Sequence, residues 1–375
     1  MTLVVRGEAV VDVRAIQASV ATLASHAATA ALMAVVKADA YGHGAAQSAR
    51  AAIAGGATWL GVAFIEEAVA LREAGIDVPI LVLVEAPPGA AALAHRHGVD
   101  LAVGTITGLR AAADAARAAD RPLRVHLEVD TGLTRGGAAA SDWPGLVTAA
   151  HDAQSAGLVD VVAVWSHLAC ADELGSPSID RQVAAFREAA DIAAPLTPAF
   201  LHLANSAATL TRPDTHFDLV RPGIACYGLS PVPHLSGGLR LEPAMTLQAR
   251  VALTKRVAGG TGISYGHRYV TPGETTVALV PMGYADGVPR AATNTAEVWI
   301  GGRRRRISGT VCMDQFAVDV GDDQVSAGDD VIIFGPGTHG EPTAQDWADA
   351  LGTISYEITT RIGPRVPRRF IGGDQ

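Results

Sequence analysis

The feature that most constrains this chain is an alternation of short β-branched runs with alanine-rich helical segments over its first two-thirds. Between the runs lie segments such as GAAQSARAAIAGG, whose apolar residues recur at helical spacing and which end in glycine. Repeated strand–helix units of this kind predict a parallel (β/α)8 barrel of the TIM type. A doubly wound open sheet is the competing fold, but it lacks support because no Gly-x-Gly-x-x-Gly turn follows the first strand. The eight expected strands end at Ala38, Phe64, Val84, Thr105, Asp130, Leu168, Asn205 and Gly223.

The character of the chain changes after about Gly238. Alanine-rich helical runs give way to short strands with glycine-bearing turns, such as TTVALVPMGYADG and DDVIIFGPG. Several of these strands alternate at period two, which is typical of an all-β domain. We therefore predict a barrel at 12–238 and an all-β C-terminal domain at 239–375, with an N-terminal strand at 1–11 that pairs with the second domain.

Composition limits the classes of function. With 49% hydrophobic residues, the chain has enough apolar residues for a large core, and its net charge of −9 argues against nucleic-acid or membrane-surface partners. The dense basic run from Arg303 to Arg306 is best explained by a solvated hairpin. The three cysteines are widely spaced and form no zinc pattern, which favours reduced thiols in a cytosolic protein. No apolar run approaches the length of a membrane span, so we expect a soluble, cytoplasmic protein.

Polar side chains gather at the predicted C-terminal ends of the strands, where barrel enzymes carry their reactive groups. In HLEVD, the alternation places His126, Glu128 and Asp130 on the face expected to point into the barrel. A metal site is not expected, because these three residues come from one strand and a second strand would have to supply further ligands. The other polar residues at these ends are Lys37, Asp39, Tyr41, Arg135, His167, His202, Asn205, Ser206 and Arg221.

Lys37 follows the apolar run LMAVV, where an isolated lysine could be an ordinary surface charge. A lysine shielded by apolar neighbours loses its proton more easily and becomes a nucleophilic amine, which suits Schiff-base chemistry. Tyr41, Ser206 and the amides after Pro222 are donors suited to a phosphate group. These residues alone predict a barrel enzyme with an active lysine, and a class I aldolase fits them equally well.

Beyond these patterns, essentially the whole chain resembles the alanine racemase family, whose members are pyridoxal-phosphate (PLP) enzymes built as a barrel plus a β domain. The motifs that carry the resemblance occur in family order, and they are AVVKADAYGHG, HLEVDTGLTRGG, WSHLACAD, LHLANSAATL, FDLVRPGIACYGLSP, ISYGHRY, VPMGYADG, VCMDQFAVD and SYEITTRIGPRVPR. The resemblance implies an enzyme that interconverts L-alanine and D-alanine, in a bacterium for cell-wall precursors.

The resemblance also implies roles for individual residues. Lys37 would hold PLP covalently and act as one of two catalytic bases. Tyr265 would be the second base, on the opposite face of the substrate, and would come from the partner subunit of a head-to-tail homodimer. His167 would lie beside the ring and support Tyr265, and Asn205 would also line the cofactor. The implied phosphate contacts are Tyr41, Ser206, Gly223, Ile224 and Tyr356.

Arg221 matches the arginine that faces the pyridine nitrogen of PLP in this family. A guanidinium there disfavours protonation of that nitrogen, because two adjacent positive charges repel. The ring is then a poorer electron sink, which favours quick reprotonation and hence racemisation over transamination. Arg135 and Met313 match substrate-binding positions, with Met313, Asp314 and Tyr284 donated by the partner subunit.

Glu128 departs from the family, which usually has a carbamylated lysine at this position to orient the arginine matched by Arg135. Our hypothesis is that Glu128 supplies the same negative charge without modification. The departure keeps a broader or serine-type amino-acid racemase open as an alternative. A non-catalytic PLP-binding barrel protein is a further alternative, but such proteins lack the C-terminal β domain and the second base.

Overall fold

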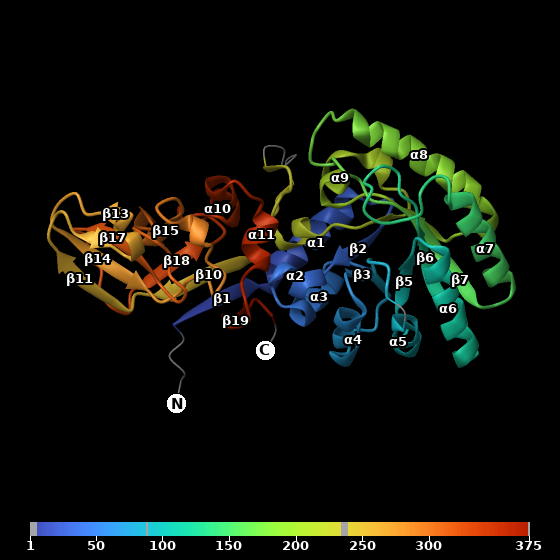
Figure 1. Ribbon diagram of the computed structural model, residues 1–375, viewed down its shortest axis with the longest axis horizontal. Helices are drawn as coiled ribbons and strands as arrows, with labels where there is room; N and C mark the ends of the chain where they lie inside the picture. Colours follow the sequence, from blue (N-terminus) through green and yellow to red (C-terminus); the bar gives the residue numbers. More distant parts are fainter. Residues whose placement is uncertain (1–5, 88, 234–238, 374–375) are drawn as a thin grey trace.

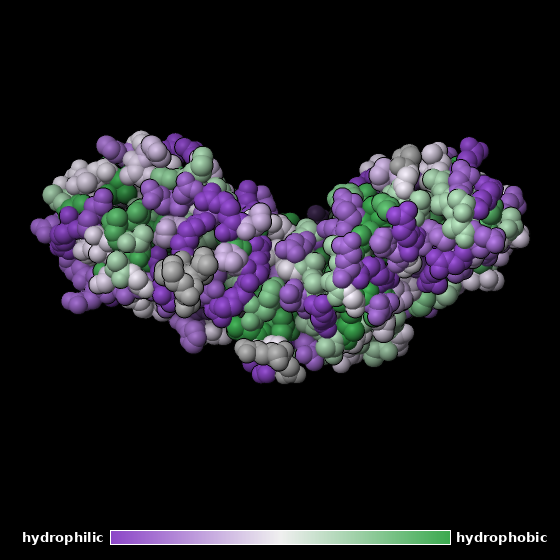
Figure 2. All heavy atoms as spheres, turned by 90° about the horizontal axis from the view of Figure 1, so that it is seen from below, coloured by the Kyte–Doolittle hydropathy of each residue, from purple (hydrophilic) through white to green (hydrophobic). Residues whose placement is uncertain are grey.

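The computed structural model describes residues 6–87, 89–233 and 239–373, and it contains two lobes (Figure 1). One lobe is a ring of strands covered by helices, and the other consists mainly of β-strands. Figure 2 shows the two lobes separated by a hollow on one side of the molecule. No helix in the described part of the chain is both long and apolar enough to cross a membrane.

The first lobe contains an eight-stranded parallel sheet in the order β8-β7-β6-β5-β4-β3-β2-β9. Its ends are joined by two hydrogen bonds, from the Asp218 N–H to the Leu201 carbonyl (3.0 Å) and from the Arg221 N–H to the Ala204 carbonyl (2.9 Å). These bonds close the sheet into a barrel, so the predicted TIM-type fold is confirmed. The strands are β2 Ala31–Val35, β3 Trp59–Val62, β4 Ile80–Val82, β5 Asp100–Val103, β6 Leu123–Glu128, β7 Val159–Trp165, β8 Phe200–His202 and β9 Leu219–Val220.

Alanine-rich helices surround the barrel and bury small side chains against it. In α6, for example, the buried residues are Leu109, Ala112, Ala113 and Ala116, which recur at helical spacing. Small side chains let helices and strands approach closely, so one apolar core joins the helical ring to the strands. The helices are α1 Val13–His26, α3 Ala45–Ala54, α4 Ile65–Glu73, α5 Ala90–His97, α6 Ile106–Ala119, α7 Trp143–Ser155, α8 Pro177–Ala193 and α9 Ser206–Thr211.

All eight predicted barrel strands exist, but each ends two or three residues before its predicted end. For example, β2 ends at Val35 rather than Ala38, and β7 ends at Trp165 rather than Leu168. Buried apolar residues such as Val36, Val129 and Leu168 follow the paired residues and extend the apolar pattern beyond the strands.

The second lobe is built on three antiparallel or mixed sheets, which confirms the predicted β domain. A six-stranded sheet has the order β16-β15-β18-β10-β1-β19, and smaller sheets have the orders β11-β14-β17 and β12-β13. The strands are β10 Met245–Arg250, β11 Leu253–Val257, β12 Gly262–Ile263, β13 Tyr269–Val270, β14 Thr275–Val280, β15 Glu297–Ile300, β16 Arg303–Arg306, β17 Phe316–Gly321, β18 Asp330–Phe334 and β19 Arg368–Ile371.

The lobe also contains two helices that the strand pattern did not predict, α10 Ala344–Leu351 and α11 Ser355–Thr360. The first of them had a sequence signal, because Thr343 and Asp346 form a reciprocal capping box at its start. The basic run lies in β16, which forms a hairpin with β15, and Arg303, Arg304 and Arg305 are paired with Asp323 and Asp346. This arrangement confirms the solvated hairpin.

The chain begins in the second lobe and then crosses to the barrel. Strand β1, Gly7–Asp12, pairs antiparallel with β10 and parallel with β19, and it leads directly into α1. Residues 1–5 of the predicted N-terminal strand lie outside the described residues. Residues 234–238, which adjoin the predicted domain boundary, also lie outside the described residues. The predicted domain boundaries therefore stay predictions.

Candidate active site

Lys37 lies at the start of a turn with unusual backbone geometry. The short element α2, Lys37–Tyr41, contains Ala38, Asp39 and Ala40 with φ of 52–54°, and Tyr41 has φ of 54°. These values define a left-handed helical turn, which costs about 1–2 kcal/mol for each residue other than glycine. The turn places the side chains of Lys37 and Tyr41, four residues apart, along the same pocket.

Hydrogen bonds from two side chains hold this turn. Glu67 Oε1 accepts from the Ala38 N–H (2.6 Å), while Glu67 Oε2 accepts from the Ala63 N–H (2.7 Å) and the Phe64 N–H (3.1 Å). His43 Nδ1 donates toward two carbonyl oxygens of the turn, each at 3.0 Å. Burial lowers the pKa of His43 to about 4, so the ring is neutral. Sequence reasoning missed Glu67. Its position three residues after Phe64 is that of a glutamate at a helix start, but its bond to the Ala38 N–H forms only in the folded turn.

The pocket has a volume of about 960 Å³ and opens at the C-terminal end of the barrel strands. It brings together most of the residues that the resemblance assigns to a site. The β domain contributes to the same pocket through α11 and the residues around it. The predicted site residues that line it are Lys37, Tyr41, Glu128, Arg135, His167, Asn205, Ser206, Arg221, Gly223 and Tyr356.

Hydroxyl and amide groups form one end of the pocket. The Ser206 hydroxyl accepts from the Gly223 N–H at 2.8 Å, and the rings of Tyr41 and Tyr356 lie 5.9 Å apart. A Cβ atom at Gly223 would collide with the Tyr41 hydroxyl, so the close approach requires glycine. Burial raises the pKa of both tyrosines, which therefore remain neutral hydroxyl donors. Ile224 does not line the pocket but is buried beside it.

Arg221 lies at the back of the pocket and is buried. Its guanidinium donates to the Ser166 carbonyl (2.8 Å), to His202 Nδ1 (2.9 Å) and to His167 Nδ1 (3.3 Å). Burial lowers the pKa of Arg221 to about 9, so the group stays charged at neutral pH. Because arginine can only donate, Nδ1 of His167 is an acceptor and the ring proton lies on Nε2.

The same environment acts on the lysine. Burial, followed by the charge of Arg135, lowers the pKa of Lys37 below its ordinary value. Burial together with the nearby cations also lowers the pKa of His167 well below its usual range. The pocket therefore combines an amine that gives up its proton more readily with a histidine that remains neutral. Asn205 lines the same wall, and its side chain caps α9.

Glu128 is buried in the wall of the pocket beside the loop that carries Arg135. It packs closely against that loop, because a Cβ at Gly136 would lie 3.2 Å from its Oε2 atom. Burial raises the pKa of Glu128 to about 7, although the charges of Arg221 and Arg135 act in the opposite direction. Both Glu128 and Arg135 lie in the described part of the chain, and no ion pair within 4.0 Å joins their side chains.

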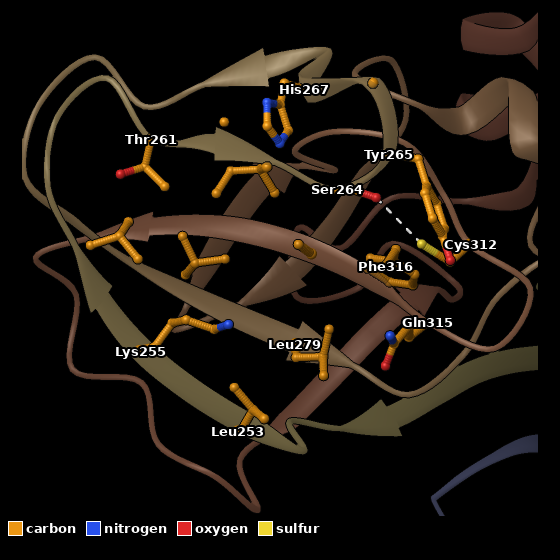
Figure 3. Close-up of a pocket in the computed structure, with 16 residues that line it drawn as sticks. Leu253, Lys255, Thr261, Ser264, Tyr265, His267, Leu279, Cys312, Gln315 and Phe316 are labelled. Atoms are coloured by element: carbon orange, nitrogen blue, oxygen red, sulfur yellow. Dashed lines mark hydrogen bonds between the residues drawn. The ribbon is translucent and has the colours of Figure 1, made fainter.

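The remaining predicted residues do not line this pocket but lie on the surface of the β domain. Tyr265 is 74% exposed, Met313 52% and Tyr284 43%. Figure 3 shows Tyr265 with Ser264 and Cys312 along a second pocket of about 540 Å³.

Hydrogen bonds hold these exposed segments together. The Tyr284 N–H donates to the Cys312 carbonyl at 3.0 Å. The Thr310 hydroxyl donates to the Tyr265 carbonyl at 2.7 Å, and Asp314 pairs with Arg365 at 2.7 Å. The four predicted residues therefore form one surface region, apart from the barrel mouth of the same chain. Among the described residues, no cluster of three or more His, Cys, Asp or Glu is suited to a metal ion.

The fold and the site together define an enzyme of the two-domain barrel class, with a lysine at the barrel mouth and a mainly β second domain. Within that class, the chain belongs to the alanine racemase family. The family model for the alanine racemase N-terminal domain matches residues 11–231, and the model for the C-terminal domain matches residues 244–370.

Individual relatives match nearly the whole chain. An alanine racemase of Thermobifida fusca is 59% identical over 368 residues, which cover 97% of this chain and 98% of the relative. The crystal structure of alanine racemase from D-cycloserine producing Streptomyces lavendulae has a TM-score of 0.96 at 51% identity, with 98% of each chain covered. A solved alanine racemase from Bartonella henselae, described with covalently bound pyridoxal phosphate, has a TM-score of 0.89 at 30% identity and covers 98% of this chain and 99% of its own.

We predict that Glu67→Gln loosens the lysine turn. A carboxamide has one acceptor oxygen, so it cannot serve both the Ala38 N–H and the N–H groups of Ala63 and Phe64. Hydrogen exchange at these amides should accelerate, and the free energy of unfolding should fall by about 1–3 kcal/mol. The matched control is Glu66→Gln, one residue earlier on the exposed face of α4, which should change neither quantity. Unchanged exchange at Ala38 in Glu67→Gln would refute this role.

Proposed function

We propose that the protein racemises alanine with PLP as its cofactor. The observation that carries the proposal is the convergence in one pocket of a lysine with a lowered pKa, a cradle of hydroxyl and amide donors, and a buried arginine. The family membership and the PLP-bound relative from Bartonella henselae support the same conclusion. We further propose a head-to-tail homodimer in the cytoplasm.

The residues of the pocket fit PLP. Lys37 would hold it covalently, while the hydroxyls of Tyr41, Ser206 and Tyr356 and the amides of Gly223 and Ile224 would bind its phosphate. These neutral donors suit a phosphate without requiring a large positive patch. When bound, PLP supplies an electron sink that acidifies the α-proton of an attached amino acid.

Two bases would move the α-proton on opposite faces of the substrate. The Lys37 amine is one base, and its lowered pKa favours the neutral form that accepts a proton. The second base would be Tyr265 of the partner subunit, and the exposure of this side chain leaves it accessible to a second copy. The Nε2–H of His167 would donate to the Tyr265 oxygen and stabilise its phenolate form. Asn205 would line the cofactor beside His167.

Arg221 and Arg135 would place positive charge beside the cofactor ring and the substrate carboxylate, respectively. Arg221 would face the ring nitrogen and keep it unprotonated, because a second positive charge there would be repelled. Arg135 would bind the substrate carboxylate, together with Met313 of the partner subunit. Asp314 and Tyr284 would support that surface from the partner side. Glu128 would act on Arg135 through its charge rather than through a contact ion pair.

The first test follows racemisation in deuterated water with PLP-loaded enzyme. L-alanine should lose its circular dichroism and gain deuterium at the α-carbon, and L-serine should react at least about tenfold more slowly. Comparable turnover of serine would instead establish a broader racemase, which the departure at Glu128 keeps open. Exchange on neither substrate would contradict the proposal and favour a non-catalytic PLP-binding protein.

A mixed-dimer experiment tests the shared active site. Lys37→Ala and Tyr265→Phe should each lower kcat by at least about a thousandfold. When equal amounts are mixed, unfolded together and refolded, half of the dimers should contain one chain of each variant. Each such dimer keeps one site with both bases, so activity should return to about a quarter of the wild-type value. No recovery in dimers shown to be mixed would mean that Tyr265 serves its own chain.

The charge of Glu128 should appear in the pH dependence of substrate binding. Since its pKa is about 7, Glu128 gains its negative charge as pH rises through that value. The ratio of KM for alanine in Glu128→Gln to KM in the wild type should therefore grow from about 1 near pH 6 to about 10 near pH 8, with kcat altered less than about threefold.

The negative charge of Glu128 should strengthen substrate binding but lower the free energy of unfolding. The raised pKa means that the folded state binds the proton more tightly than the unfolded state does. The wild type should therefore lose stability relative to Glu128→Gln as pH rises from about 4.5 to about 7, and urea unfolding at several pH values measures this difference.

A Glu128→Lys variant with unaltered kinetics and no bound carbamate would count against the role of Glu128.

A further inference from the structure

A line of buried polar side chains crosses the otherwise apolar interior of the barrel. His126 in β6 and His202 at the end of β8 are completely buried, and Asp100 at the start of β5 is 2% exposed. Polar groups buried among apolar side chains cost free energy unless they are hydrogen-bonded. The apolar residues of this interior layer are Met33, Trp59, Leu81, Ala102, Val162, Trp165 and Leu219.

The polar side chains form one continuous series of contacts from the base of the barrel to the pocket. Arg124 Nε donates to Asp100 Oδ1 at 2.9 Å, and Asp100 Oδ2 lies 3.2 Å from His126 Nε2. His126 Nδ1 lies 3.0 Å from His202 Nε2, and His202 Nδ1 lies 2.9 Å from the Arg221 guanidinium. The last member is the arginine at the back of the pocket.

With the carboxylate ionised and both histidines neutral, one arrangement of protons satisfies every contact in this series. Arg221 can only donate, so His202 Nδ1 must accept and the ring carries its proton on Nε2. That Nε2–H donates to His126 Nδ1, which therefore leaves the proton of His126 on its own Nε2. The His126 Nε2–H then donates to the Asp100 carboxylate.

The charges along the line agree with this arrangement. Burial and the charge of Arg221 lower the pKa of His202 well below its usual range, which keeps the ring neutral. Burial alone would raise the pKa of Asp100, but hydrogen bonds from His126 and Arg124 outweigh it and lower that pKa. The carboxylate is therefore an ionised acceptor at neutral pH.

We propose that Asp100 and His126 are positioning residues, which fix the tautomer of His202 so that its Nδ1 lone pair faces the Arg221 guanidinium. The opposite tautomer would place an N–H of His202 against an N–H of Arg221, and the guanidinium would have to turn or withdraw. The consequence for catalysis rests on the proposed function, in which Arg221 faces the ring nitrogen of PLP. The tautomer itself does not depend on that function.

The first measurement uses the wild-type holoenzyme labelled with ¹⁵N-histidine. Two-bond ¹H–¹⁵N correlation spectra distinguish the two neutral tautomers and the protonated ring. We expect His126 and His202 to be neutral, each with its proton on Nε2. A proton on Nδ1 of either ring would overturn the proposal, whatever the variants show.

The second measurement compares three variants. Asp100→Leu removes the acceptor, and it should give mixed tautomers at His202 and lower kcat by about tenfold or more, with KM altered less than about threefold. Asp100→Asn keeps an acceptor oxygen and should restore most of the lost kcat. The matched control is Asp160→Leu, because Asp160 is half exposed and lies 3.6 Å from the same Arg124. It should leave kcat and the histidine signals unchanged.

The outcomes separate this inference from the proposed function. A folded Asp100→Leu enzyme with wild-type kcat and tautomers would overturn the inference, as would an equal loss in Asp160→Leu. If Asp100→Leu does not fold, the tautomers of His126 and His202 in the wild type decide whether the inference holds. If the wild type racemises no amino acid, the proposed function fails while the tautomers remain measurable. Racemisation with a proton on His202 Nδ1 would refute the inference alone.

Discussion

The left-handed turn after β2 is the constraint on which the rest of this structure depends. A right-handed helix or a loop beginning at the same residue would aim Lys37 and Tyr41 differently, and the pocket would lose either its amine or its tyrosine hydroxyl. Four residues with positive φ cost several kcal/mol together. The carboxylate of Glu67 and the ring of His43 offset part of that cost by binding backbone groups of the turn and its neighbours.

The same turn explains why the barrel and the β domain are in contact at the pocket. Gly42, at the end of the turn, packs so closely under α11 that a Cβ atom there would collide with the Thr359 carbonyl. Arg368 donates to the Gly42 carbonyl at 3.0 Å and to the Gly363 carbonyl at 2.7 Å. One guanidinium thus joins the end of the lysine turn to the segment after α11. Because α11 carries Tyr356 into the pocket, the β domain completes a site whose lysine belongs to the barrel.

The eight repeats of strand and helix predicted the barrel, because the apolar residues of each element recur at the spacing of that element and are the residues that it buries. The strand ends were predicted too late because buried apolar residues such as Leu168 extend the pattern beyond the last paired residue of the strand. The contact of Glu67 with the Ala38 N–H could not be predicted, since it forms only when the left-handed turn has folded beside α4. Its contacts with the Ala63 and Phe64 N–H groups are those of a glutamate in the first turn of a helix. The inward direction of His126 followed from alternation, but its contact with His202 depends on the curvature of the closed barrel.

Burial acts on two cations in the same pocket with different results. It lowers the pKa of Lys37, which favours a neutral amine, and it lowers the pKa of Arg221 only to about 9, which leaves a guanidinium charged at neutral pH. A lysine at position 221 would start from an ordinary pKa about two units lower, so equal burial would leave it only partly charged at neutral pH. An arginine therefore keeps its positive charge at a buried position where a lysine would lose much of it. The intrinsic difference between the two side chains lets one pocket hold an amine that favours its neutral form beside a guanidinium that stays charged.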